Sequence, residues 1–216
     1  MQAYLNNPKL KEQVLAELQA HYDADNFIKG TYWENGKGCA VGCLLKSGNH
    51  IEYEKKYGIP VYLARLEDEI FEGLSNGEAK EWPLDFMSSF EVGKDYSNVV
   101  WDFLKWLLLE YLLPKVTEAG KIFDNVRQSL KDCAAVLGKD CTDAADAAYA
   151  ALDAADAADY RSAADAAYAA YSAAAAYDAA DYAVNYAVDY AADYSLDCAA
   201  AYTEFSNKLI ELIKKV

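Results

Sequence analysis

The spacing of apolar residues predicts a chain built from helices. After Pro8, the residues Leu10, Val14, Leu18 and Tyr22 recur every four positions, which is typical of an amphipathic helix that begins at a proline. No stretch alternates between apolar and polar residues for long enough to indicate a β-sheet. The expected fold class is therefore all-α.

A second amphipathic segment spans residues 61–74, and further helices are expected at residues 77–90, 97–113 and 115–137. The apolar positions of the 61–74 helix, expected to be buried, are Leu63, Leu66, Ile70 and Leu74. Its charged positions, expected to face solvent, are Arg65, Glu67, Asp68 and Glu69. The helical domain is thus expected to bury one face of each helix and to expose the other.

The last third of the chain consists mainly of alanine, aspartate and tyrosine. From Thr142 to Tyr202 there are twenty-nine alanines among sixty-one residues, and no glycine or proline interrupts them. Alanine has the highest intrinsic helix propensity, so this pattern predicts one continuous helix over residues 142–216. At 1.5 Å per residue, that helix would be roughly 110 Å long.

Apolar residues near the end of this predicted helix recur at intervals of four and three, which indicates a heptad seam. A single helix cannot bury such a seam, so it must pack either against its own amino-terminal domain or against copies of itself. Faces made of small alanines favour close helix–helix packing, so we expect a coiled-coil-like homo-oligomer. The residues expected at this interface are Val184, Val188, Cys198, Tyr202, Phe205, Leu209, Leu212 and Val216.

These patterns predict three parts: a helical globular domain at residues 1–114, a connecting helix and hinge at 115–141, and the oligomerisation helix at 142–216. The net charge is −15, of which about −9 falls in the last part. Such a charge disfavours direct nucleic-acid binding and anionic membranes, and favours a basic protein as a partner. Five scattered cysteines without a signal segment indicate a reduced, cytoplasmic protein, and no apolar run is long enough to cross a membrane.

The segment from Gly36 to Cys43, with the sequence GKGCAVGC, is the most distinctive candidate for a site. A glycine loop that leads into a helix N-terminus could bind an anion through free backbone amides, and Lys37 would add a positive charge. The same glycines could instead serve only close packing. The residues expected around a bound ligand are His21, Trp33, Gly36, Lys37, Gly38, Cys39, Cys43 and His50.

Two other chemistries use some of these residues. Cys39 or Cys43 could act as a nucleophile with His50 or His21 as the base. The same four side chains could hold a structural zinc ion, although the spacing of the cysteines is unlike that of common zinc knuckles. No cofactor motif is present, and none of these arrangements is diagnostic of an enzyme.

Several motifs in order carry a resemblance to a known family: GCAVGC at residues 38–43, GIP at 58–60, and the segment from Leu63 to Leu74. Together they resemble a family of uncharacterised proteins from bacteriophages, prophages and bacterial genomes over about the first 113 residues. Some members of that family carry a similar alanine-rich tail. The resemblance implies a compact helical domain and a viral or mobile-element origin, but no catalytic residue.

The favoured hypothesis is a non-enzymatic oligomeric binding protein, in the host cytoplasm if it is phage-encoded. As an anti-defence protein it would sequester a small anionic, nucleotide-like ligand or block a basic host protein. A cysteine-dependent enzyme and a purely structural assembly are the alternatives.

Overall fold

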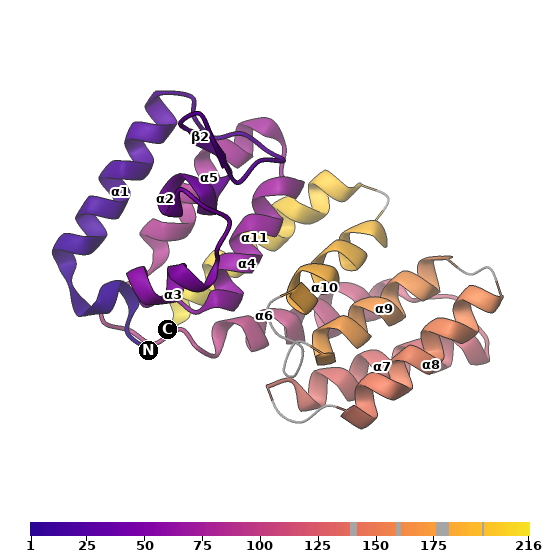
Figure 1. Ribbon diagram of the computed structural model, residues 1–216. Coiled ribbons are helices and arrows are strands. Elements are labelled where there is room, and N and C mark those ends of the chain that lie inside the picture. The colour runs from indigo at the N-terminus through magenta and orange to yellow at the C-terminus, as the bar shows by residue number, and fades with distance from the viewer. Residues whose placement is uncertain (139–141, 159–160, 176–181, 196) are drawn as a thin grey trace. The chain divides into compact units, whose positions relative to one another are not determined.

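The computed structural model describes residues 1–138, 142–158, 161–175, 182–195 and 197–216, and most of these are helical (Figure 1). The all-α prediction is confirmed. The chain forms two compact units: unit 1 contains residues 1–100 and 199–216, and unit 2 contains residues 101–198. These boundaries differ from the division expected at residues 114 and 141, because the last helix belongs with the first hundred residues.

Unit 1 contains the helices predicted after Pro8 and at residues 61–74 and 77–90, and the start of the one predicted at 97–113, and each begins within two residues of its expected start. The helix predicted at residues 115–137 lies in unit 2 and begins six residues later than expected, at Lys121. Its elements in chain order are η1 (Ala3–Asn6), α1 (Pro8–Asp23), β1 (Trp33–Glu34), β2 (Lys37–Gly38), α2 (Ala40–Leu45), α3 (Ile51–Tyr57), α4 (Val61–Gly73), α5 (Asn76–Ser89), the start of α6 (Val99–Trp106) and α11 (Cys198–Lys215). Asn7 caps α1 by accepting a hydrogen bond from the Lys9 amide, and Pro8 occupies the first helical position.

The two short strands form an antiparallel hairpin that the sequence analysis did not predict. Its turn is Asn35-Gly36, and both residues have positive φ, 51° and 86°. This conformation is that of a two-residue turn whose twist matches paired strands, for which Asn-Gly is the preferred sequence. The glycine loop is therefore an ordered hairpin.

Helix α4 lies at the centre of unit 1, where it packs against α2, α3 and α5. Leu63, Leu66, Ile70 and Leu74 are buried, as predicted. Helix α11 also reaches α4, because a Cβ on Gly73 would lie 2.2 Å from the ring of Tyr202. The apolar face of α4 therefore contributes to the core of the unit.

The charged face of α4 is also buried, which corrects the prediction that it faces solvent. The exposed fractions of Arg65, Glu67 and Asp68 are 6%, 0% and 6%, whereas Glu69 is half-buried. An amphipathic pattern shows which face is apolar, but it does not show whether other elements cover the polar face as well. Polar groups on neighbouring elements meet one carboxyl oxygen of Glu67 and one of Asp68, as described below.

Unit 2 is a helical bundle. Its elements are the remainder of α6, the π-helical turn η2 (Leu107–Leu112), η3 (Leu113–Lys115), α7 (Lys121–Val136), α8 (Thr142–Ala157), α9 (Arg161–Ala175) and α10 (Tyr182–Asp193). Helix α9 is central, because it packs against α7, α8, α10 and η2.

The prediction of one helix over residues 142–216 is wrong. The segment forms α8, α9, α10 and α11, and α9 packs against both α8 and α10, which a continuous straight helix would not permit. The small side chains explain the arrangement, because alanine faces let helix axes approach closely within one chain. The alanines of α9 that are at most 4% exposed are Ala163, Ala164, Ala166, Ala167, Ala169, Ala170, Ala173 and Ala174.

The proposed interface seam does not run along one helix, because α10 belongs to unit 2 and α11 to unit 1. Four of its residues, Val188, Tyr202, Phe205 and Leu209, are already buried in a single copy of the chain. Cys198 and Val216 are exposed, Leu212 is half-buried, and the side chain of Val184 lies outside the described part. The unburied seam that motivated self-association is therefore not present in these helices.

Among the helices that the structure describes, none combines the length and the apolar character that a bilayer crossing requires.

Candidate functional site

The glycine motif leads into helix α2, as predicted. Cys39 is the N-cap residue, and its Sγ accepts a hydrogen bond from the Gly42 amide at 3.4 Å. The glycines themselves are explained by packing, because a Cβ on Gly38 or Gly42 would lie 1.9 Å or 1.4 Å from the carbonyl oxygen of Tyr32. Close approach of the Tyr32 backbone therefore accounts for both glycines without a ligand.

The two cysteines of the motif are poorly suited to nucleophilic catalysis. Cys39 and Cys43 are 1% and 0% exposed. Burial raises the pKa of both thiols, that of Cys43 to about 12, and the nearby Asp68 carboxylate raises the pKa of Cys39 further. Because the thiolate is the reactive form, both residues are in an environment typical of inert, structural cysteines.

The two histidines have different surroundings. His21 stands edge-on to the ring of Trp33, with ring centroids 5.7 Å apart. His50 is 1% exposed, and its Nε2 lies 3.2 Å from Asp68 Oδ2. Among the described residues, no group of three His, Cys, Asp or Glu side chains is placed to hold a metal ion. The four residues considered for zinc therefore do not form a metal site here.

A buried polar cluster that the sequence analysis missed lies on α4. His50 Nδ1 lies 3.0 Å from the Gly48 carbonyl oxygen, and its Nε2 faces Asp68. A neutral imidazole donates from only one of its two nitrogens. His50 and Asp68 can therefore form both contacts only if the pair carries one proton more than a neutral imidazole beside an ionised carboxylate. Beside it, the hydroxyl of Tyr53 donates to Glu67 Oε2 at 2.7 Å.

Glu67 is the least solvated carboxyl of this cluster. Burial raises its pKa to about 8, and the neighbouring Asp68 acts in the same direction, against the hydrogen bond from Tyr53. Within the described part of the chain, Glu67 Oε1 and Asp68 Oδ1 have no hydrogen-bond partner. The cluster is enclosed in the core, so its main consequence is for stability rather than for binding.

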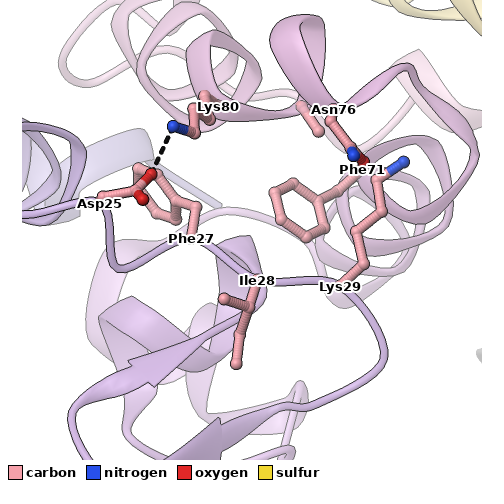
Figure 2. Close-up of a pocket in the computed structure, with 8 residues that line it drawn as sticks. Asp25, Phe27, Ile28, Lys29, Phe71, Asn76 and Lys80 are labelled. Carbon is pink, nitrogen blue, oxygen red and sulfur yellow. Dashed lines mark ion pairs between the residues drawn. The ribbon is translucent and has the colours of Figure 1, made fainter.

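An open pocket lies elsewhere in unit 1, with a volume of about 300 Å³ (Figure 2). Three segments form it: the turn after α1, the end of α4 and the first turns of α5. The residues that line this Phe27–Phe71 pocket are Asp25, Phe27, Ile28, Lys29, Phe71, Asn76, Ala79 and Lys80. It therefore combines aromatic rings with charged and amide groups.

Figure 2 shows Asp25 and Lys80 on one side of the pocket, next to the Phe27 ring, and Lys29 and Asn76 on the other side, with the Phe71 ring between them. Lys80 forms an ion pair with Asp25, and the Lys29 ammonium donates to the Leu74 carbonyl oxygen. The rings of Phe27 and Phe71 meet edge to face, with centroids 6.4 Å apart. Lys29 and Lys80 thus line the pocket from opposite sides.

Hydrogen bonds fix the turn that carries Lys29 and Asp25. The Gly30 amide donates to both carboxylate oxygens of Glu72, at 3.0 and 2.9 Å. Asp25 has a positive φ of 53°, and Lys37 Nζ donates to its backbone carbonyl oxygen at 3.1 Å. A third lysine therefore stands at the rim of the pocket.

The ion pair at the rim keeps both of its members charged. The hydrogen bond from Lys80 lowers the pKa of Asp25, and the same contact raises the pKa of Lys80. Two lysines, Lys37 and Lys80, lie beside Asp25, so this side of the pocket carries more positive than negative charge, in a chain whose net charge is −15. On the other side, Glu72 and Glu78 are close enough to Lys29 to interact with its charge.

None of the eight residues expected to bind a ligand lines this pocket, although several are near it. Lys37 reaches its rim, and His21 contacts Phe27, with ring centroids 6.2 Å apart. The sequence analysis missed Phe27, Lys29 and Lys80. The available signal was the apolar pair Phe27-Ile28 within an otherwise polar turn, but nothing in the sequence indicates that α5 lies opposite that turn.

No protein-family model, curated protein or solved structure matches this chain.

Proposed function

We propose that unit 1 binds a small organic anion in the Phe27–Phe71 pocket without transforming it. The observation that carries the proposal is a pair of lysines on opposite sides of a pocket lined by aromatic rings, in a strongly acidic chain. With the resemblance to phage-encoded proteins, such binding would suit a protein that withdraws a small anionic signal from a host.

The composition of the pocket supports this proposal. Small-molecule sites combine an apolar lining with a few polar groups that orient the ligand. The apolar lining comes from Phe27, Ile28, Phe71 and Ala79, and the donors come from Lys29, Asn76 and Lys80. A volume of about 300 Å³ is at the lower end of the usual range of such sites, so the ligand is no larger than about one nucleotide.

Binding is favoured over catalysis because the strongest nucleophile candidates lie elsewhere. Cys39 and Cys43 are buried thiols with raised pKa values, and neither lines the pocket. Lys29 and Lys80 are already engaged with a carbonyl oxygen and a carboxylate, as expected of charge partners. The alternative of a cysteine-dependent enzyme therefore has less support than a binding site.

Calorimetric titration of the full chain with phenyl phosphate, benzoate and benzylamine tests the proposal. We expect the two anions to bind and the cation of similar size not to bind. Replacing both lysines, K29A/K80A, should weaken anion binding at least about tenfold, which corresponds to the loss of one charge-assisted contact.

The matched control is K46A/K55A, which removes the same charge from two exposed lysines that pair with Glu17 and Glu52. This control should bind the anions as the unaltered chain does. Equal binding of anion and cation, or unchanged anion binding in K29A/K80A, would show that the pocket is not an anion site.

A further inference from the structure

The carboxylate of Asp25 holds the position at which an anion would meet Lys80. The two form an ion pair at the pocket rim, and the Asp25 side chain is 67% exposed (Figure 2). Its backbone carbonyl oxygen is held by Lys37, so the residue is anchored through its main chain while its carboxylate stays accessible. Asp25 is therefore an internal anion placed on a cationic site.

This arrangement distinguishes between ligands of different charge. A monoanion that replaced the Asp25 carboxylate would exchange one single charge for another at Lys80. A dianion retains a second charge for Lys37, whose ammonium group also lies beside Asp25, and Coulomb energy scales with ligand charge. The site therefore favours a doubly charged group.

The donors around the pocket indicate which dianion fits. Lys80 on α5 and Lys37 on β2 both lie beside Asp25 and can donate to the same group from separate directions. A phosphate monoester offers three terminal oxygens and a charge of about −1.5 to −2 at neutral pH, whereas a carboxylate offers two oxygens and a single charge. Lysine ammonium groups are common partners of phosphate in proteins.

The aromatic base indicates the rest of the ligand. The Phe27 and Phe71 rings, with Ile28 and Ala79, line the pocket. Aromatic groups pack against phenylalanine rings in stacked or edge-to-face contacts, which contribute beyond the area that they bury.

We propose that the pocket takes a phosphate monoester that carries a flat aromatic group, of about mononucleotide size, and that its phosphate displaces Asp25 from Lys80. This inference rests on the function proposed above and specifies its ligand class. The displacement costs little, because an exposed ion pair contributes at most about fivefold to an equilibrium constant.

The test compares three probes with the same aromatic group: adenosine monophosphate, adenosine 5′-carboxylate and adenosine. Each is titrated into the full chain and into Asp25→Asn. We expect the monophosphate to bind at least about tenfold more tightly than the carboxylate, and adenosine to bind weakest. D25N should tighten monophosphate binding by about three- to fivefold, carboxylate binding by less, and adenosine binding not at all.

Two features make the variant informative. Asparagine tolerates the positive φ of Asp25 as well as aspartate does, so D25N should fold. Glu12→Gln removes the same charge from the exposed face of α1, away from the pocket, and should leave all three affinities unchanged.

The outcomes separate the two proposals. If lysine-dependent anion binding persists but the phosphate and carboxylate probes bind equally, or D25N leaves the monophosphate affinity unchanged, the phosphate assignment is wrong and anion binding stands. If neither these probes nor phenyl phosphate and benzoate bind in a lysine-dependent way, the anion site itself is wrong.

Discussion

At the scale of single residues, the main finding is that ionisable side chains occupy the core of unit 1. Glu67 is fully buried, and Tyr53 supplies one hydrogen bond to its carboxyl group. A buried carboxyl group favours its neutral form, because desolvation penalises the charge. Since the pKa of Glu67 is about 8 in the folded state, the folded protein keeps a proton that the unfolded chain loses above about pH 4.5.

This difference predicts a pH-dependent stability. The contribution of Glu67 to the free energy of unfolding is fully present below pH 4.5. It is lost as pH rises toward 8, because the unfolded state then binds fewer protons than the folded state. Glu67→Gln removes this titrating group. Between pH 5 and 8, the free energy of unfolding of the variant should therefore fall by at least about 1 kcal/mol less than that of the unaltered chain. Urea unfolding at several pH values measures this difference.

The control for this prediction is Glu81→Gln, an exposed position on α5. It should retain the pH profile of the unaltered chain. If E67Q also retains that profile, Glu67 is not the proton-binding group.

At the scale of elements, glycines determine how closely the Tyr32 backbone approaches α2. The helix begins after Cys39, and Gly42 faces the Tyr32 carbonyl oxygen at a separation that leaves no room for a Cβ. Gly77 in the first turn of α5 is different, because nothing lies within 4 Å of the position that its Cβ would occupy. The two positions therefore form a matched pair.

We predict opposite effects of the same substitution at these two glycines. Gly42→Ala should lower the free energy of unfolding by about 3 kcal/mol or more, since rigid backbone atoms must move. Gly77→Ala should leave it unchanged or raise it by up to about 1 kcal/mol through helix propensity. Thermal and urea unfolding measure both effects, and a well-tolerated G42A would contradict the packing explanation of the motif.

At the scale of the whole molecule, acidic charge is concentrated in unit 2. Its sequence contains seventeen acidic and seven basic residues, so it carries about −10 of the net −15, and unit 1 carries the remainder. The pocket with its lysines therefore lies in the less acidic unit. The alanine-rich helices bury their small faces against one another within one chain, which removes the reason to expect an oligomer.

We accordingly predict that the full chain is a monomer. Light scattering coupled to size-exclusion chromatography should give a mass near 23.9 kDa across a range of protein concentrations. A stable dimer or larger assembly would restore the oligomerisation hypothesis, with the exposed Cys198 and Val216 as its remaining interface candidates.

The sequence by itself determined features that depend on neighbouring residues. Helix starts follow from local signals such as Asn7-Pro8, and the apolar stripe of α4 follows from side-chain spacing. The hairpin at Asn35-Gly36 was also readable, because its turn chemistry is local, but it was missed. Alanine content correctly indicated helix, though not where the helices end.

Only the tertiary structure decided what lies opposite each element. Nothing local to Glu67 or Asp68 shows that His50 and Tyr53 cover the polar face of α4. The alanine-rich segment folds back because α9 buries its faces against other helices, a gain that helix propensity does not include. The pocket likewise joins Asp25 to Lys80, and the physical reason is the same, since burial and charge pairing depend on distances in space rather than along the chain.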